Sequence, residues 1–359
     1  TPSERARVQG WFSSVFGVAA IVGPALGAFL VEHVHWSVVF WVNLPIGIVS
    51  IAMFWLFLNE RVERREHRID YLGGGLLVIG IGALMLALVQ AGSLDGINIA
   101  GLVAVGAGAL VWLVLHEGRT REPMFPFNLW GRRVVWLSNL AGFGAAAVMM
   151  AVTAVLPAYV QGVMGRSPGL AGFVVGAASV SWMFASIAAG RLMIRTSYRL
   201  TAAIGGAALV AGSLMLLMLD ASSPPLLAAG AAFMIGIAMG FCNTTFLVAI
   251  QATVGWSERG IATGSQMFMR MIGQAVGAAL LGAMLNWGVN RHLPGAGDAV
   301  NHLLHPALRH TLAPGEIARL GDAFALSAQE AFLVVVLTAV ATLVLTLALP
   351  RRLSPTHPD

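Results

Sequence analysis

The sequence predicts an all-α polytopic membrane protein with about ten transmembrane helices. Its 359 residues are 58% apolar and only 10% charged, whereas an ordinary globular protein carries roughly 25% charged residues. A water-exposed surface of this size needs more ionised groups, so lipid is the favoured surrounding. The apolar segments are also about 20 residues long, which suits membrane-spanning helices, and they lack the alternating pattern of barrel strands.

Ten apolar segments account for most of the chain. From the N-terminus they are residues 10–32, 37–58, 71–92, 96–116, 134–161, 168–190, 199–219, 224–250, 261–287 and 329–349. The first two contain Gly23-Pro24 and Asn43-x-Pro45, which membrane helices tolerate because neighbouring helices satisfy the freed backbone groups. Asp70 precedes the third segment, where a carboxylate suits a helix N-terminus. Most of the segments contain no charged residue at all.

Glycine is abundant in these segments, as expected where helices approach one another closely in lipid. The chain has 42 glycines. Three pairs have a spacing that puts both members on one helix face: Gly172 and Gly176, Gly236 and Gly240, and Gly273 and Gly277. These pairs predict helix packing in the sixth, eighth and ninth segments.

The arginines predict how the segments thread through the membrane. One alternating set of connections holds Arg5, Arg7, Arg61, Arg64, Arg65, Arg68, Arg119, Arg121, Arg132, Arg133, Arg191, Arg195, Arg199, Arg259, Arg351 and Arg352, and the other set holds Arg166, Arg291, Arg309 and Arg319. The arginine-rich set is expected in the cytoplasm. Ten spans then place both ends of this chain in the cytoplasm, in a multi-pass protein of the inner or plasma membrane.

Residue types that the sequence lacks exclude several functions. All 21 basic residues are arginine, so there is no Walker phosphate loop and no lysine for Schiff-base chemistry. The arginines form no basic face with interleaved aromatic residues, and we therefore expect no nucleic-acid partner. The single cysteine, Cys242, permits no internal disulfide and no cysteine-rich metal site.

The longest connection, residues 288–328, raises the question of a metal site. It contains His292, His302, His305 and His310. His302 and His305 could share a helical face, but no acidic or cysteine ligand stands beside them. A solvated amphipathic segment is favoured, and no metal is predicted.

Arg270 is the clear ionisable residue inside a predicted helix, about 12 Å from its start at 1.5 Å per residue. Burying a charge in the membrane costs a few kcal/mol, so such a residue is a candidate for function. It could contact a substrate or a carboxylate, hold an inner gate together through neighbouring helices, or reach back to the cytoplasmic surface. No acidic residue lies plainly in mid-membrane, and Glu32 is a weak candidate at an outer end.

Several motifs resemble the major facilitator superfamily, most closely its fourteen-helix drug:proton antiporters (EmrB/QacA type). Gly17, Gly23-Pro24 and Gly27 resemble the antiporter signature of helix five, although Ala28 stands where a final glycine is usual. The stretch from Asn43 to Gly47 resembles the start of helix six, and the stretch from Arg270 to Gly277 resembles helix thirteen. The resemblance implies antiporter-motif or gating roles for Gly17, Gly23, Pro24, Gly27, Arg270, Gly273 and Gly277.

The resemblance also implies an architecture. The ten spans would be helices five to fourteen of fourteen, and the chain would be an N-terminally truncated fragment. Residues 1–58 would hold the last two helices of the N-terminal bundle, residues 59–133 the cytoplasmic linkers and an inserted central helix pair, and residues 134–359 the C-terminal six-helix bundle. A degenerate copy of the family's loop motif keeps Gly190, Arg191, Arg195 and Arg199, with Ile194 in place of the usual aspartate.

By the same resemblance, helices nine, ten, twelve and thirteen line the C-terminal half of a transport cavity. The substrate-cavity candidates are the polar and aromatic residues on or at the ends of these helices, namely Asn139, Gln161, Trp182, Asn243, Thr244, Gln266 and Gln274. Ordinary hydrogen bonds between helices are the alternative role for each of them.

The predicted function is proton-coupled efflux of small lipophilic or cationic compounds by alternating access, without a catalytic residue or a cofactor. The proton gradient would supply the energy, and membrane lipid and a small-molecule substrate would be the partners. Whether a periplasmic adaptor also binds is not indicated by the sequence. The alternatives are a major facilitator that exports one metabolite, lipid or antibiotic and, remotely, a non-transporting membrane scaffold. The fragment alone is expected not to transport, because half of the cavity would be missing.

Overall fold

The computed structural model describes residues 33–35, 37–58, 70–90, 94–120, 127–255, 258–294 and 314–350, with a few further positions between 19 and 30. Throughout these ranges the secondary structure is helical, with no strand. The contacts divide the chain into two units, Thr1–Ile69 and Asp70–Asp359. The predicted domain boundaries at 58/59 and 133/134 remain predictions.

The first unit contains α2 (Val38–Trp41) and α3 (Asn43–Phe57), which continue each other through the helical backbone of Val42. Pro45 lacks the N–H that would bond to the carbonyl four residues earlier, so the ladder is interrupted at this point. The Asn43 amide donates to the Val39 carbonyl at 2.9 Å and supplies a local side-chain bond there. The Asn-x-Pro sequence is thus accommodated within one span, Val38–Phe57.

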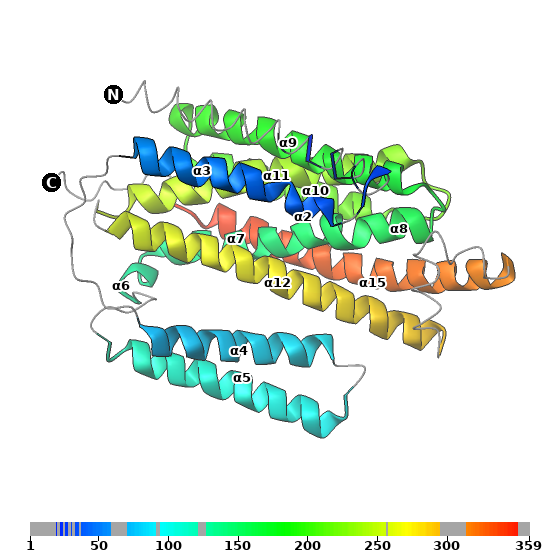
Figure 1. Ribbon diagram of the computed structural model, residues 1–359, viewed down its shortest axis with the longest axis horizontal. Helices are drawn as coiled ribbons and strands as arrows, with labels where there is room; N and C mark the ends of the chain where they lie inside the picture. The colour runs from blue at the N-terminus through cyan, green and yellow to red at the C-terminus, as the bar shows by residue number, and fades with distance from the viewer. Residues whose placement is uncertain are drawn as a thin grey trace. The chain divides into compact units, whose positions relative to one another are not determined.

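Helices α4 (Tyr71–Val89) and α5 (Gly96–Glu117) form an antiparallel pair that lies side by side in Figure 1. The Asp70 carboxylate accepts from the Gly73 N–H at 2.9 Å, which confirms the predicted N-cap. Gly80 and Gly106 let the two helices approach closely. A Cβ added at Gly80 would lie 2.7 Å from Leu110, and one added at Gly106 would lie 2.7 Å from Leu84.

The remaining helices begin with a short α6 (Phe127–Trp130) and a long span made of α7 (Arg133–Met150), η1 (Ala151–Val155) and α8 (Leu156–Gly162). The η1 turn is π-helical and lies just before Pro157. A proline inside a span removes one backbone donor, and a wider local turn is a common response. The span stays continuous from Arg133 to Gly162.

Four further long helices come next in the described part of this unit: α9 (Pro168–Arg195), α10 (Tyr198–Leu217), α11 (Pro225–Ala252) and α12 (Arg259–His292). They are followed by α15 (Pro314–Leu347). Ser167 and Ser197 cap α9 and α10 by accepting from the Leu170 and Leu200 N–H groups. A serine hydroxyl satisfies one of the free donors at each helix start.

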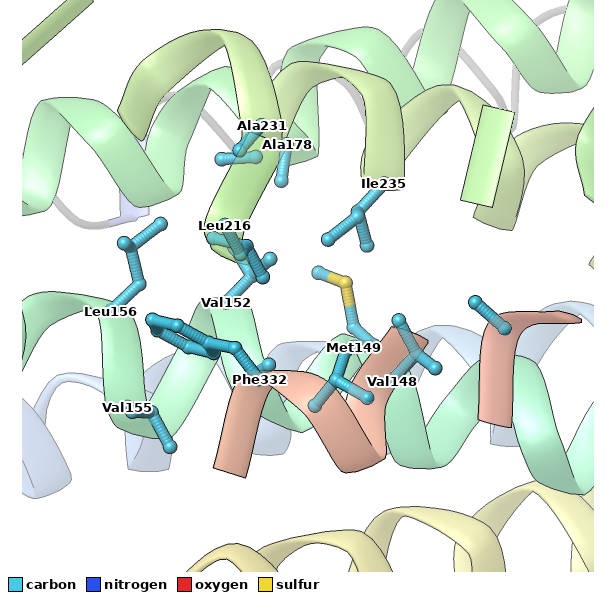
Figure 2. Packing of buried hydrophobic residues seen from close by; sticks show 14 of the residues in the cluster. Val148, Met149, Val152, Val155, Leu156, Ala178, Leu216, Ala231, Ile235 and Phe332 are labelled. Carbon is cyan, nitrogen blue, oxygen red and sulfur yellow. The ribbon is translucent and has the colours of Figure 1, made fainter. Parts of the chain in front are cut away.

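The apolar core of this unit lies where α7, η1, α9, α10, α11 and α15 meet. Figure 2 shows Val148, Met149, Val152, Val155 and Leu156 from the long first span, with Phe332 of α15 beside them. Ile235 and Ala231 of α11, Ala178 of α9 and Leu216 of α10 close the cluster from the other side. Each of these side chains is at most 5% exposed.

Two of the three predicted glycine pairs lie at close helix contacts. Gly236 and Gly240 of α11 face the backbone of α9, where an added Cβ at Gly240 would lie 2.7 Å from the Trp182 carbonyl. Gly273 and Gly277 of α12 face α7 at Phe143 and Ala147. The third pair, Gly172 and Gly176, has no atom of another residue within 4 Å of an added Cβ.

In the described part of the chain, nine helices are long and apolar enough to cross a membrane. They correspond to the last nine predicted segments, and the first segment, 10–32, falls mostly outside the described residues. Gly17 and Pro24 belong to that undescribed part, whereas Gly23 and Gly27 are described and have open space around an added Cβ. The chain is a multi-pass membrane protein built of helices.

Three helix boundaries differ from the prediction. Helix α9 runs to Arg195 instead of residue 190, and α12 runs to His292 instead of residue 287. Helix α15 begins at Pro314, well before the predicted residue 329, so part of the expected long loop is helical. Glu316, Arg319 and Asp322 lower the hydropathy of this first part without lowering its helix propensity, since proline and an acid both suit a helix start.

Candidate functional site

The candidate site is the group of polar side chains on α7, α11 and α12. These helices pack on one another inside the second unit, and they carry Asn139, Asn243, Gln266 and Arg270 among the residues predicted from the sequence. We call these four residues, together with Trp130 and Ser265, the polar cluster.

Asn139 and Ser265 connect α7 to α12. Asn139 is fully buried, and its amide donates to the Ser265 hydroxyl at 3.0 Å. The Trp130 indole N–H donates to the same hydroxyl at 3.1 Å. The Asn139 amide oxygen, by contrast, has no hydrogen-bond partner among the described residues.

Gln266 occupies a space that glycine leaves open. Its side chain is 2% exposed, and its Nε2 atom would lie 3.3 Å from a Cβ added at Gly142 of α7. This Nε2 has no hydrogen-bond partner in the described structure. Leaving a buried N–H group without a partner costs about 1–3 kcal/mol, so Gln266 is a candidate to donate to a bound acceptor.

Arg270 connects α12 to α11. Its Nη1 donates to the Asn243 amide oxygen at 3.3 Å, and its Nε is buried with no partner among the described residues. The ion pairs that the described residues form, such as Arg132–Glu258, do not include it. The structure therefore places the guanidinium between two helices with its Nε donor unpartnered among the described residues, and the three roles considered for it remain predictions.

The other predicted cavity residues lie apart from this cluster or at its border. Thr244 and Gln274 are half-buried on α11 and α12. Trp182 is half-buried on α9 and packs against the apolar core. Gln161, on α8, donates to the Pro157 carbonyl at 3.3 Å, one turn earlier. Four helices thus carry these residues, and their contact with a substrate remains a prediction.

Sequence reasoning missed Trp130, Ser265 and the buried hydroxyl of Ser138, whereas Thr245, whose hydroxyl is also buried, was among the polar residues that it considered. Neither hydroxyl has a hydrogen-bond partner in the described part of the chain. Ser265 accepts from residues 126 and 135 positions earlier in the chain, a separation at which no local pattern signals contact. Its place next to Gln266 in a membrane helix was the available signal.

A second set of contacts joins the arginine-rich ends of these helices. Arg132 donates to the Thr253 carbonyl at 2.6 Å and to Glu258 at 3.1 Å. Gln251 donates to Thr263 at 2.9 Å across the turn between α11 and α12. A half-exposed ion pair contributes about 0–1 kcal/mol to the free energy of unfolding. The main effect of these contacts is therefore to position α6 and α7 at this end.

The degenerate loop motif lies at the junction of α9 and α10. Arg191 and Arg195 belong to the last turns of α9, and Thr196 and Ser197 alone separate this helix from α10. Both arginines are exposed, and positive charge near a helix C-terminus is favourable. Gly190 and Arg199 are half-buried. A gating role for this motif remains a prediction.

Two histidines of the second unit contact carboxylates. His302, His305 and His310 lie outside the described residues, whereas His292 ends α12 with its Nε2 3.5 Å from Glu330. His116 of α5 lies 3.0 Å from both oxygens of Asp70. In the described ranges, no group of three histidine, cysteine or acidic residues could hold a metal ion.

The Asp70–His116 contact closes one end of the α4–α5 pair. The Gly73 N–H is the main cause of a lowered pKa of Asp70, and His116 lowers it further, against the opposing effect of burial. Thr120 donates to the His116 carbonyl at 3.0 Å, and the buried Glu117 lies near Gly73. This arrangement fixes the helix ends and stands apart from the polar cluster.

The sequence profile of the Major Facilitator Superfamily matches residues 1–278. Multidrug transporter protein MdtP of Bacillus subtilis (strain 168) is 29% identical over 289 residues, which cover 80% of this chain and 53% of that protein. Multidrug resistance protein 3 of the same organism is 27% identical over 79% of this chain and 56% of its own length. Efflux pump FUS6 of Gibberella moniliformis (strain M3125 / FGSC 7600) is 29% identical over 82% of this chain and 55% of its own length.

The chain spans about half the length of the curated relatives that it matches. Among solved structures, it is similar to a bacterial homologue of the human lysosomal transporter Spinster in an inward-facing and unoccupied conformation. The TM-score is 0.53 at 14% sequence identity, and the match covers 96% of this chain and 71% of that one. At this identity the likeness concerns the fold alone.

Proposed function

Because this chain belongs to the major facilitator superfamily, we propose that it forms part of an efflux transporter for small lipophilic compounds. The observation that carries the proposal is the match, over about four-fifths of the chain, to relatives named as a multidrug transporter and an efflux pump. Transport by alternating access requires helices that rearrange as bodies around a site, and it requires no catalytic group. The polar cluster would then be a binding or coupling site.

We assign the chain to the fourteen-helix drug:proton antiporter family within this superfamily. The α4–α5 pair supports the assignment, because it is an apolar hairpin that precedes the six spans from Arg133 to Leu347. Proton coupling is part of the proposal and rests on the antiporter-like glycine pattern around Gly23 and Gly27. A titrating group that favours one of two conformations would supply the coupling.

The proposed location is the cell membrane, with the arginine-rich helix ends in the cytoplasm. Among the described residues, the arginine-rich ends carry Arg119, Arg132, Arg133, Arg191, Arg195, Arg199 and Arg259, whereas the opposite ends carry Arg166, Arg291 and Arg319. Positive charge in short connections is retained on the cytoplasmic side. Membrane lipid and a small molecule are the proposed partners.

The test is resistance in an efflux-deficient bacterial host that expresses the complete reading frame containing this chain. We expect raised minimum inhibitory concentrations for several chemically unrelated lipophilic compounds and loss of the effect with a protonophore. The empty vector, grown in parallel, is the control for the host. Resistance to one compound only would favour a dedicated exporter, and no change for any compound despite membrane expression would contradict efflux.

A further inference from the structure

Arg270 has hydrogen-bond donors that the described part of the chain leaves unused. A guanidinium carries five N–H donors in a planar fork. One of them reaches the Asn243 amide oxygen at 3.3 Å, which is longer than the usual 2.7–2.9 Å of a bond between a charged donor and a charged acceptor. The Nε donor is buried and has no partner among the described residues. The guanidinium is therefore able to donate to a further, better-matched acceptor.

Gln266 adds a second unused donor one turn away. Residues four apart on a helix lie on the same face, about 5–6 Å between their Cβ atoms. The Gln266 side chain is 2% exposed, and its Nε2 lacks a partner in the described structure. Two buried donors that lack partners among the described residues thus lie on adjacent turns of α12, where both are able to donate to an oxygen-bearing acceptor.

The charge of this region selects the acceptor. Away from the helix ends, Arg270 is the one ionised side chain in the described residues of α7, α9, α10, α11 and α12. Among the described residues, no carboxylate forms an ion pair with Arg270. Such a positive charge repels cations and attracts anions, and the effect is strong where water is scarce. A carboxylate also matches the guanidinium fork, because it accepts two parallel N–H bonds.

An apolar surface adjoins the same turn of the helix. Met267 and Met271 stand beside Arg270 on α12 and are 42% and 61% exposed. Methionine side chains adapt to irregular apolar shapes because they are unbranched and polarisable. A charged head group held by Arg270 would therefore have a soft apolar surface next to it for the rest of the molecule.

We propose that Arg270, assisted by Gln266, binds the carboxylate of amphiphilic substrates whose apolar part lies on Met267 and Met271. The inference rests on the proposed efflux function and deepens it, because it names the substrate class. The class is lipophilic compounds that carry one carboxylate, which is narrower than the small lipophilic or cationic compounds expected from the sequence alone.

The test is equilibrium binding of a matched pair of probes to the purified protein in phosphatidylcholine nanodiscs. One probe is 11-(dansylamino)undecanoate, and the other is its methyl ester, which has the same tail and no charge. Binding is followed by dansyl fluorescence, with empty nanodiscs subtracted for partition into lipid. Because the readout is binding, it does not require that the protein transports either probe.

We expect the wild-type protein to bind the carboxylate about ten-fold or more tightly than the ester, since a hydrogen bond to a charged group is commonly worth that ratio. In Arg270→Gln the ratio should fall to about one. Arg270→Lys, which keeps the charge and loses the fork, should give an intermediate ratio, and Gln266→Met should reduce it in part. The matched control is Arg291→Gln, which removes an exposed arginine near the other end of α12 and should keep the wild-type ratio.

Equal affinity for the two probes in the wild type would overturn the inference, as would a preference that survives in Arg270→Gln. Size-exclusion profiles and thermal unfolding identify any variant that fails to fold. If Arg270→Gln does not fold, a wild-type ratio in both Arg270→Lys and Gln266→Met would overturn the inference. A protein that confers resistance to lipophilic cations but shows no carboxylate preference would retain the proposed efflux function and refute this site. A carboxylate preference in a protein that confers no resistance would support this site and contradict the proposed efflux function.

Discussion

At the scale of single residues, a glycine on α12 is either packed or open according to the face on which it lies. Gly277 approaches α7 so closely that an added Cβ would be 2.6 Å from the Ala147 carbonyl, whereas Gly282 has no such neighbour within 4 Å. In lipid, close backbone approach of this kind is a main source of helix association. The two positions therefore form a natural pair for substitution.

We expect Gly277→Ala to destabilise the protein and Gly282→Ala to leave it unchanged or slightly more stable. The new methyl group at 277 has to push α7 away, a type of overpacking that costs about 1–3 kcal/mol. Alanine at an open helical position gains up to about 1 kcal/mol in propensity over glycine. The apparent melting temperature in detergent measures both. Equal melting temperatures for the two variants would show that α7 and α12 are not tightly packed at this point.

At this scale, the sequence predicted which residues share a helix face but not which neighbours cover that face. Spacing identified three glycine pairs, but the pair Gly172 and Gly176 has the same spacing as the packed ones and faces open space. Spacing defines which residues share a face; which neighbour covers that face depends on the tertiary arrangement. The same limit applies to Asn139, whose partner Ser265 is far away in the chain.

At the scale of elements, two aspartates begin the two helices of the α4–α5 pair with different effects. Asp70 accepts from the Gly73 N–H and contacts His116, whereas Asp95, at the start of α5, makes no side-chain bond to its helix. A side-chain cap satisfies a free N–H and holds the first turn in place. Asp95 is thus a matched control for Asp70.

We expect Asp70→Asn to speed hydrogen exchange in the first turns of α4 at neutral pH, and Asp95→Asn to have no comparable effect on α5. The pKa of Asp70 is lowered from 3.8 in the folded protein, so the ionised carboxylate favours the folded helix end. This contribution is fully present above the unfolded pKa and is lost as the pH falls through the folded one. The difference between wild type and variant should therefore shrink below about pH 3.8, after correction for intrinsic exchange rates. A difference that stays constant through this range would show that the charge of Asp70 is irrelevant.

Helix existence was predictable because each span is long and apolar, but helix ends were not. Where charged residues such as Glu316 and Arg319 enter a helix, hydropathy falls and the expected span begins too late, as it did for α15. For the same reason the predicted span ended at residue 190, whereas α9 extends through Arg191 and Arg195. Apolar content reports the part of a helix that lies in lipid, whereas the helix itself continues beyond it.

At the scale of the whole molecule, the fold class followed from a shortage of charge and a repeated length. Nine described spans agree with the last nine expected ones because lipid requires each crossing segment to satisfy its own backbone. The site did not follow in the same way. The polar cluster depends on how α7, α11 and α12 pack together. Apolar contacts drive this packing, and the sequence pattern does not indicate which apolar residue contacts which.

The proposed threading of the molecule is testable because the native cysteine is hidden. Cys242 is 1% exposed, so it should react little with a maleimide. Labelling of a single cysteine introduced elsewhere can therefore be detected. Thr196, between α9 and α10, and Ala221, between α10 and α11, are both exposed. The 20 residues of α10 separate them, a length of about 30 Å and thus one bilayer core.

We expect Ala221→Cys to react with a membrane-impermeant maleimide in intact cells and Thr196→Cys to react only after permeabilisation. The reason is that the α9–α10 junction carries Arg191, Arg195 and Arg199, whereas the α10–α11 turn carries Asp220 and no arginine, and positive charge is retained in the cytoplasm. The unmodified chain serves as the control for labelling of Cys242. If Thr196→Cys were labelled in intact cells and Ala221→Cys were protected, the whole molecule would thread the opposite way, and the cytoplasmic assignment of every arginine-rich connection would be wrong.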